Sequence, residues 1–367
     1  MSLNRIDPAQ YEAQLADKLA ALRQNFAGLA LPEPEVFRST PLHYRMRAEF
    51  RLWHHDGRID YAMFESAEGE KKVVLIETFP ALTKPICDLM PRLRDCLQES
   101  EVLRNKLFQV EFLATLSGEL MVCLIYHRAL DDEWTAQAQA LVDRFGVNLI
   151  GRSRKQKIVL GRDWLLERFE LDGRALQYQQ IEGSFTQPNV GVNRQMLGWA
   201  CRQVADAGGD LLELYCGNGN FTIALAPAFD RVLATEVSKS SVAAAHYNLD
   251  ANRVDNVTLV RMSSDEISDA LAGGREYLRM KDVALDSYRF STLFVDPPRS
   301  GLDAATVELA RGFERILYIS CNPATLRDNV AALHDTHEIV AAAVFDQFPY
   351  THHLESGLLL RRRLVAD

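Results

Sequence analysis

A glycine turn between a predicted strand and a predicted helix is the first feature of this chain that could do chemistry. A short apolar run ends in Gly217 and Gly219, and the apolar segment Phe221–Phe229 follows at once. Such turns let a ligand approach the backbone, and they cradle phosphates or nucleosides in doubly wound α/β folds. The third glycine of the dinucleotide fingerprint and the Gly-Lys-Ser/Thr of a P-loop are both absent. Glu213, inside the strand, suits a cationic ligand better than a pyrophosphate.

A carboxylate follows this turn at an informative distance. The next predicted strand, Arg231–Glu236, ends in Glu236, nineteen positions after Gly217. At that spacing an acid can hold both hydroxyls of a ribose. A ribose, a positive charge and no phosphate describe S-adenosylmethionine, so the two features together predict a site for this cofactor. A strand turn without any ligand is the alternative that this segment leaves open.

A second predicted strand end carries Asp296, and ligands of open α/β sheets bind outside the carboxyl ends of the strands. Two prolines follow Asp296; they fix an extended turn and hold the carboxylate at the sheet edge. Arg299 comes next, where amino-methylating enzymes of nucleic acids carry an aromatic residue. A guanidinium in this place favours a phosphate or a carbonyl edge.

Cys321 lies at the end of a third predicted strand, just before an Asn-Pro turn that begins a helix. We expect the helix N-terminus to lower the pKa of this thiol, which favours a nucleophile. The other five cysteines are interpreted as small core residues, and no C-x-x-C pair points to zinc or an iron–sulfur cluster. His352 and His353 are adjacent, so both cannot easily face one ion, and we expect no metal there.

A thiol nucleophile, a carboxylate base and a methyl donor at one sheet edge suit the methylation of carbon 5 of a pyrimidine. Carbon 5 becomes nucleophilic only after a thiolate adds to carbon 6, and a base must then remove the carbon-5 proton so that the thiol can leave. A cytosine-5 methyltransferase uses the same addition and is the runner-up. A small-molecule methyltransferase is disfavoured by the basic first half of the chain.

Length and composition restrict the other classes of protein. A chain of 367 residues suggests about two domains, and its apolar (47%) and charged (25%) fractions are ordinary for a globular protein. A net charge of −9 argues against indiscriminate nucleic-acid coating but leaves room for a focused basic patch. No apolar run approaches the roughly 20 residues that cross a bilayer, and no secretory signal is evident. We therefore expect a cytoplasmic protein with no membrane contact and no obligatory protein partner.

The two predicted domains differ in their strand patterns. Residues 1–180 read as an α+β domain with antiparallel pairing, whereas residues 181–367 alternate strands with helices and predict a parallel sheet that ends in an antiparallel hairpin. A helix over residues 8–27 could pack on the catalytic domain, and the sequence leaves its place open. Arginines alternate along one face of a predicted strand over 43–53, a candidate RNA surface or an ordinary solvated face.

The densest positive segment, residues 151–162, is the best candidate for phosphate contacts. It contains no acid and five basic residues: Arg152, Arg154, Lys155, Lys157 and Arg162.

From Tyr11 to the C-terminus the sequence resembles the tRNA (uracil-5-)-methyltransferases, the TrmA type of the RNA 5-methyluridine methyltransferase family. The matching stretches are Ser184–Asn189, Leu212–Phe221, Val295–Leu302, Ile319–Pro323 and Phe345–His353. The resemblance implies a class I S-adenosylmethionine-dependent methyltransferase with a Rossmann-like, mostly parallel seven-stranded sheet and an antiparallel terminal strand, plus an N-terminal α+β RNA-binding domain. Relatives that act on ribosomal RNA carry an added N-terminal barrel and a four-cysteine iron–sulfur cluster. This chain has neither, which favours the tRNA branch.

The resemblance also implies the substrate and the roles of individual residues. It implies methylation of the T-loop uridine in the T-arm of tRNA, giving ribothymidine, and of the equivalent uridine of tmRNA. Cys321 would be the nucleophile and Glu355 the base. The implied cofactor contacts are Gln187, Tyr215, Asn220, Glu236 and Asp296, and the implied RNA contacts are Phe108, Phe185 and Arg299. A tRNA-folding protein that acts independently of methylation is the non-enzymatic alternative.

Overall fold

The structure, a computed structural model, describes residues 6–67 and 70–364. Its chain divides into two units. The first unit comprises residues 1–11, 40–169 and 180–190, and the second comprises residues 12–39, 170–179 and 191–367. This division does not follow the predicted boundary at residue 180: residues 12–39 and 170–179 are counted with the second unit, and residues 181–190 with the first.

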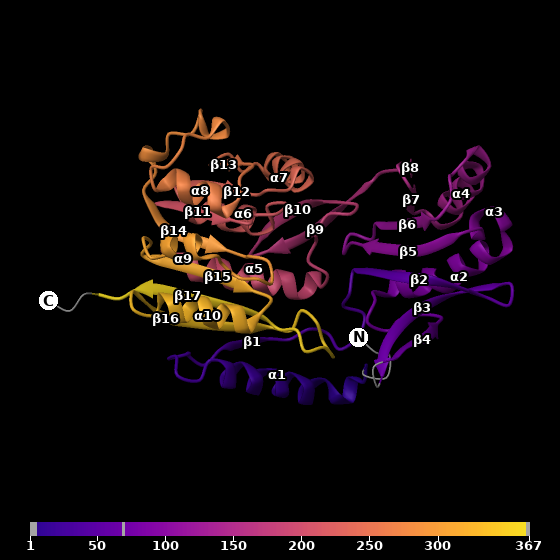
Figure 1. The fold of residues 1–367 in the computed structure, drawn as a ribbon, viewed down its shortest axis with the longest axis horizontal. Coiled ribbons are helices and arrows are strands. Elements are labelled where there is room, and N and C mark those ends of the chain that lie inside the picture. The colour runs from indigo at the N-terminus through magenta and orange to yellow at the C-terminus, as the bar shows by residue number, and fades with distance from the viewer. Residues whose placement is uncertain (1–5, 68–69, 365–367) are drawn as a thin grey trace. The chain divides into compact units, whose positions relative to one another are not determined.

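The second unit contains an eight-stranded sheet with the order β1-β16-β17-β15-β14-β11-β12-β13 (Figure 1). All neighbouring pairs are parallel except those that β17 makes with β15 and β16. The strands are β1 (Glu35–Phe37), β11 (Asp210–Leu214), β12 (Arg231–Thr235), β13 (Val257–Val260), β14 (Phe290–Val295), β15 (Arg315–Ser320), β16 (His337–Phe345) and β17 (Glu355–Arg362). The predicted parallel sheet with a final antiparallel hairpin is thus confirmed.

The strand β1 was not predicted from the sequence. It adds an eighth strand beside β16, and Phe37 stacks on Phe345 with ring centroids 4.9 Å apart. Three residues are too few to show an alternating pattern, so only this long-range pairing reveals the strand.

Helices pack against this sheet, as expected for strands that read as continuous apolar runs. One core joins strand residues to side chains from α1 (Tyr11–Asn25), α8 (Ser264–Leu271), α9 (Ala304–Ala310) and α10 (Pro323–Leu333). The remaining helices are α5 (Val190–Val204), α6 (Asn220–Leu225) and α7 (Lys239–Asn252). Trp199 of α5 packs edge-on against Phe345, and a Cβ at Gly357 would lie 2.6 Å from the Trp199 ring. Glycine is therefore required in β17 for this close approach.

The helix α1, whose place the sequence left open, belongs to the second unit from Glu12 onward. Leu22 near the end of α1 and Phe26, which directly follows the helix, are buried in the core of that unit.

The first unit contains a seven-stranded sheet with the order β4-β3-β2-β5-β6-β7-β8. Its elements are β2 (Arg47–His55), β3 (Arg58–Ala67), β4 (Glu70–Ile76), α2 (Lys84–Glu99), α3 (Glu101–Arg104), β5 (Leu107–Ala114), β6 (Leu120–Tyr126), α4 (Asp132–Phe145), β7 (Asn148–Ser153) and β8 (Gln156–Leu160). The alternation predicted along β2 is confirmed, because Ala48, Phe50 and Leu52 are buried and Glu49 and Arg51 are exposed.

A hairpin that the sequence analysis did not identify comprises β9 (Trp164–Leu171) and β10 (Arg174–Ile181). Its tip is counted with the second unit. There the backbone N–H groups of Gln177 and Gln179 donate to the side chains of Asn252 and Asn248 on α7, at 3.0 and 2.6 Å.

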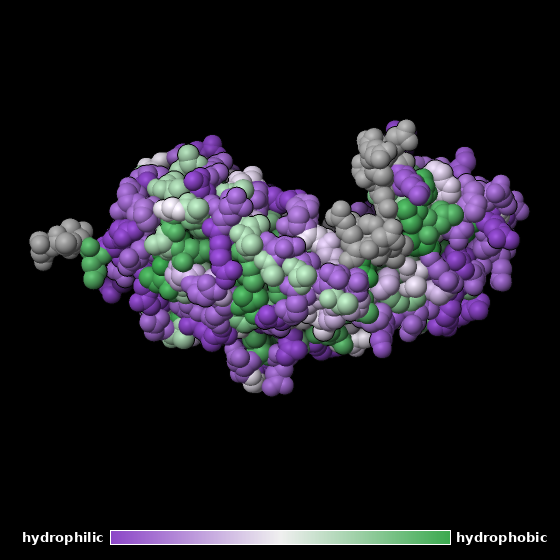
Figure 2. All heavy atoms as spheres, turned by 90° about the horizontal axis from the view of Figure 1, so that it is seen from below, coloured by the Kyte–Doolittle hydropathy of each residue, from purple (hydrophilic) through white to green (hydrophobic). Residues whose placement is uncertain are grey.

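No helix among the described residues is long and apolar enough to span a membrane. Figure 2 shows hydrophilic residues over most of the face it presents, with smaller apolar areas between them.

Candidate active site

The glycine turn follows β11, whose five residues are all buried. Tyr215, Gly217 and Gly219 all have positive φ angles, of 62°, 57° and 82°. Gly219 is the N-cap residue of α6, and a Cβ at Gly217 would meet no atom within 4 Å. The backbone therefore turns tightly into the helix while one side of Gly217 stays open to a ligand, as the sequence predicts.

Glu236 lies beside this turn because β11 and β12 are parallel neighbours whose last residues are in register. One carboxylate oxygen accepts from the backbone N–H of Gly217 at 3.0 Å, and the other accepts from Ser238 at 2.7 Å. These two bonds fix the carboxylate at the loop, at the position expected for an acid that holds a ribose.

Two carboxyl groups lie at the neighbouring strands β11 and β14: Glu213 is buried within β11, and Asp296, which directly follows β14, is half-buried. Burial raises the pKa of Glu213 to about 8, with a further contribution from Asp296, and burial raises the pKa of Asp296 to about 7. Neither oxygen of Glu213 has a hydrogen-bond partner among the described residues. A cation placed between such groups favours their ionised forms, so the pair suits a sulfonium better than an anion.

The other predicted cofactor contacts are Asn220, Tyr215 and Gln187. The side-chain amide of Asn220 exchanges two hydrogen bonds of 2.9 Å with Asn193 of α5, a buried partner that the sequence analysis did not identify. Tyr215 is half-buried, and burial raises the pKa of its phenol. Gln187 is half-buried in the segment 180–190 of the first unit.

Cys321 and Glu355 are brought together by the register of the sheet. In the antiparallel pair β15–β17, Ser320 faces Ser356, so Cys321 and Glu355 are the next residues at the same end. Glu355 is 6% exposed and Cys321 is half-buried. Asp296 follows β14, the parallel neighbour of β15, so all three groups lie at one edge of the sheet.

The three groups influence one another's ionisation. Burial raises the pKa of Cys321 to about 11, and the carboxylates of Glu355 and Asp296 add to this shift. Burial raises the pKa of Glu355 to about 8, again with Asp296 contributing. Arg299 acts in the opposite direction on the pKa of both Cys321 and Glu355.

The expectation that a helix N-terminus lowers the pKa of Cys321 is therefore wrong. The N-terminus of α10 is capped by Asn322, whose side chain accepts from the N–H of Ala324 at 3.2 Å. Burial and two neighbouring carboxylates outweigh the single guanidinium and a backbone hydrogen bond, so the pKa of the thiol is raised.

Arg299 is held in place through both its side chain and its backbone carbonyl group. Its Nη2 donates to Nδ1 of His353 at 3.3 Å, and its carbonyl oxygen accepts from the side chains of Asn322 at 2.9 Å and Thr325 at 3.3 Å. His353, which the sequence analysis considered only as a metal ligand, is thus a partner of the guanidinium.

The two predicted RNA contacts of the first unit, Phe108 and Phe185, have different surroundings. Phe108 stacks on His127 with ring centroids 4.0 Å apart, and the guanidinium of Arg51 lies 3.5 Å from the Phe108 centroid. Phe185 is 72% exposed. Arg51 and His127 thus cover both faces of the Phe108 ring, whereas the exposed ring of Phe185 is a surface on which a base could stack.

The basic segment 151–162 is less available than its composition suggests. Arg152 donates to both oxygens of Glu182, at 2.6 and 2.5 Å, and Lys157 pairs with Asp163 at 2.8 Å. Arg162 pairs with Glu119 at 3.0 Å. Arg154 and Lys155 are exposed in the turn between β7 and β8.

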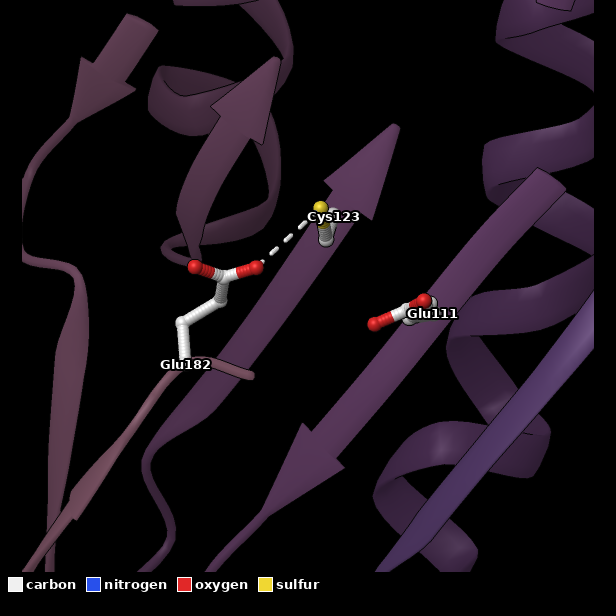
Figure 3. Close-up of side chains that lie close together, drawn as sticks. All are labelled: Glu111, Cys123 and Glu182. Atoms are coloured by element: carbon white, nitrogen blue, oxygen red, sulfur yellow. Dashed lines mark hydrogen bonds between the residues drawn. The ribbon is translucent and has the colours of Figure 1, made fainter. Parts of the chain in front are cut away.

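Glu111, Cys123 and Glu182 form a group of possible metal ligands in the first unit (Figure 3). Their ligand atoms all lie within 4.8 Å of one another, and Cys123 donates to Glu182 at 3.8 Å. Arg152 and Lys157 already neutralise Glu182, so a metal ion would have to displace two cationic side chains. We interpret the group as part of an ion-pair cluster.

Comparison with known proteins identifies the family. The sequence profile described as tRNA (Uracil-5-)-methyltransferase matches residues 10–363. A tRNA/tmRNA (uracil-C(5))-methyltransferase of Aromatoleum aromaticum is 71% identical, over 99% of this chain and 98% of the relative. The protein of the same name from Azoarcus sp. is 70% identical, over 99% of both chains.

Among solved structures, the tRNA (uracil-54, C5)-methyltransferase of Pyrococcus abyssi in complex with S-adenosyl-L-homocysteine has the same fold, with a TM-score of 0.72 and 23% identity. The match covers 95% of this chain and 83% of the archaeal one. The fold is thus that of an S-adenosylmethionine-dependent methyltransferase, and this chain belongs to the tRNA (uracil-5-)-methyltransferase family.

Proposed function

We propose that this enzyme methylates carbon 5 of the T-loop uridine of tRNA, position 54, and the equivalent uridine of tmRNA, in the cytoplasm. The position is that in the name of the archaeal protein, and tmRNA is in the names of the bacterial relatives. The observation that supports this proposal most directly is the placement of Cys321 beside Glu355 at the edge of the sheet that carries the glycine turn.

Cys321 is the nucleophile in this proposal. Its sulfur adds to carbon 6 of the uracil ring, and the electron pair moves to carbon 5. The thiol must first lose its proton to solvent, and the nearby Arg299 favours the thiolate. Burial opposes ionisation in the free enzyme, so the thiolate forms with the substrate in place.

Glu355 is the base. After carbon 5 has taken the methyl group, the Glu355 carboxylate removes the proton from carbon 5, the double bond re-forms, and the Cys321 sulfur leaves. A base works best when its pKa lies near the working pH, and burial has moved the pKa of Glu355 to about 8.

S-adenosylmethionine, when bound, supplies the electrophilic methyl group and leaves as S-adenosylhomocysteine. Glu236 would hold the ribose hydroxyls, and Gly217 would let the nucleoside lie against the backbone. Glu213 and Asp296 would provide negative charge near the sulfonium. Tyr215, Asn220 and Gln187 complete the proposed cofactor contacts, with Asn220 oriented by Asn193.

The RNA contacts are proposed on the basis of stacking and charge. A T-loop uridine is buried in folded tRNA and has to be unstacked and flipped out. Single-stranded loop recognition relies on aromatic stacking and local cations. The exposed Phe185 supplies the first, and Arg299, Arg154 and Lys155 supply the second. Phe108 is proposed as an RNA contact from the family resemblance, since Arg51 and His127 cover its ring. Arg152 contributes indirectly, because its charge is directed to Glu182.

A T-arm hairpin with 5-fluorouridine at the target position tests the mechanism. Fluorine at carbon 5 cannot be removed as a proton, so a stable protein–RNA adduct at Cys321 should form only when S-adenosylmethionine is present. The Cys321→Ala variant should form no adduct and should not methylate. A variant that still methylated would contradict the proposal.

The same hairpin with cytosine in place of the target uridine separates the runner-up activity, since a cytosine-5 methyltransferase would prefer it. A Cys321→Ala protein that loses methylation but still remodels tRNA would show a folding activity beside the methylation.

A further inference from the structure

One face of α1 is hydrogen-bonded to the segment that leads to Glu355. Gln14 and Lys18, one helical turn apart, both donate to Asp346, at 2.9 and 2.6 Å. Lys18 also donates to the carbonyl oxygen of Phe348 at 2.8 Å, and the amide oxygen of Gln14 accepts from the N–H of Tyr350 at 3.2 Å. In Figure 1, α1 runs along β1, the edge strand that pairs with β16, and the segment begins where β16 ends.

The same face of α1 also reaches the turn that follows Cys321. The amide of Asn25 donates to the carbonyl oxygen of Pro323 at 2.7 Å. Pro323 is the first residue of α10 and lies two positions after Cys321. Between Lys18 and Asn25, Leu22 is buried in the core, so the helix is anchored between its two polar contacts.

A chain of hydrogen bonds joins these two contacts across the proposed active site. The Phe348 carbonyl accepts from Thr351 at 2.7 Å, and the Thr351 hydroxyl accepts from the N–H of His353 at 3.2 Å. His353 accepts from Arg299, whose carbonyl accepts from Asn322, the residue between Cys321 and Pro323. The hydrogen bonds thus run from Lys18 through the Glu355 segment and Arg299 to the Cys321 turn and back to α1 at Asn25.

The ion pair between Lys18 and Asp346 is buried, and removing both charges from water costs free energy. The side chains are 6% and 0% exposed, and burial lowers the pKa of Lys18 against the attraction of Asp346. A well-packed apolar pair often gives equal or greater stability at such a place, whereas polar pairs can fix one geometry among several. The geometry fixed here is that of the segment ending in Glu355.

We propose that α1 is a positioning element of the reaction, in which Lys18 orients the Glu355 segment and Asn25 orients the Cys321 turn. This inference rests on the roles proposed above for Cys321 and Glu355. Reacting groups displaced by about 1 Å can lose on the order of a hundredfold in rate. Loosening either contact should therefore slow the step that the contacted residue performs.

Two rate measurements distinguish the effect of the Lys18 contact from that of the Asn25 contact. The rate of adduct formation with 5-fluorouridine T-arm RNA reports on Cys321 addition and methyl transfer but not on Glu355, because fluorine blocks the Glu355 step. The decay of the adduct formed with ordinary uridine RNA reports on Glu355. Lys18→Met should slow decay by about tenfold or more, so that a methylated, covalent protein–RNA complex accumulates, and should leave trapping within about threefold of the parent. Asn25→Leu should slow trapping and leave decay unchanged.

Arg23→Met is the matched control, since Arg23 lies on the exposed side of α1 in an ion pair with Glu33. It should change neither rate. Lys18→Met leaves Asp346 buried and unpaired, so the double variant Lys18→Met/Asp346→Asn is measured with it. The double variant should recover thermal stability but not the decay rate. Recovery of both, or equal slowing of both rates in the single variants, would overturn the inference in favour of a purely structural role.

Glu355→Gln distinguishes a failure of this inference from a failure of the proposed function. If Glu355→Gln accumulates the adduct and Lys18→Met does not, only the positioning role is wrong. If Glu355→Gln accumulates none, Glu355 is not the base, and the role of Lys18 is overturned together with it.

Discussion

Cys321 and Glu355 are the next residues beyond the Ser320–Ser356 pair that ends the antiparallel ladder of β15 and β17. One strand ends at the thiol and the other begins at the carboxyl group. Carbons 6 and 5 of a uracil are bonded to each other, so a nucleophile for one and a base for the other must lie close together. The reversed strand β17 provides this proximity, because its first residue meets the carboxyl ends of the parallel strands.

The first prediction concerns the pH dependence of Glu355. The carboxylate form is the base and acts after methyl transfer, so the decay of the methylated adduct should become faster as pH rises towards the pKa of Glu355, about 8, and should level off above it. Glu355→Gln should abolish turnover at every pH and accumulate the adduct with ordinary uridine RNA. Methyl-transfer assays between pH 6 and 9.5, paired with denaturing gels for the adduct, measure both. Turnover by Glu355→Gln would show that another group is the base.

The second prediction concerns Arg299. Its charge favours the ionised forms of Cys321 and Glu355, so Arg299→Gln should raise the pKa of both. The pH profile of 5-fluorouridine trapping should then move upward by about one pH unit, while Arg299→Lys should move it less. A loss of RNA affinity with an unmoved pH profile would instead support the role inferred from the sequence, that of an RNA contact only.

Local patterns predicted the parts of the fold and site that depend on neighbouring residues. The glycine turn, the acid at residue 236 and the last hairpin are each encoded within one or two adjacent elements, and each is found where expected. Strand ends of a parallel sheet meet at one edge, so Asp296 and Cys321 could also be placed near each other before their contacts were known.

Features that depend on distant residues could not be predicted in this way. Lys18 and Asp346 are separated by 328 positions, and nothing in the helical pattern of α1 distinguishes a buried lysine from an exposed one. The predicted direction of the Cys321 pKa shift was wrong because it too depends on residues distant in the sequence. The sequence shows the helix that follows the thiol, but not the two carboxylates that the sheet brings beside it.

The third prediction separates two residues of the basic segment. Lys155 is exposed, so Lys155→Ala should weaken tRNA binding and reduce the slope of log Kd against log salt by about one. Arg152 neutralises Glu182, so Arg152→Ala should leave the salt slope nearly unchanged and instead lower the unfolding temperature. Binding titrations from 50 to 300 mM salt, on the order of the range where such slopes are measured, with thermal unfolding of each variant, provide the test. Equal salt slopes for the two variants would contradict this assignment.

The fourth prediction concerns Glu213 and stability. Its pKa is about 8 when folded, whereas an exposed glutamate in the unfolded chain titrates near 4.3. The folded state therefore holds an extra proton between these values, and stability must fall as pH rises through that window. Glu213→Gln cannot ionise and should gain on the parent by up to about 4 kcal/mol between pH 5 and pH 9. Urea unfolding at both pH values measures the gain, with the exposed Glu276→Gln as control. A gain that is equal at the two pH values would show that the Glu213 carboxyl is not the group responsible, since only a titrating side chain makes the difference depend on pH.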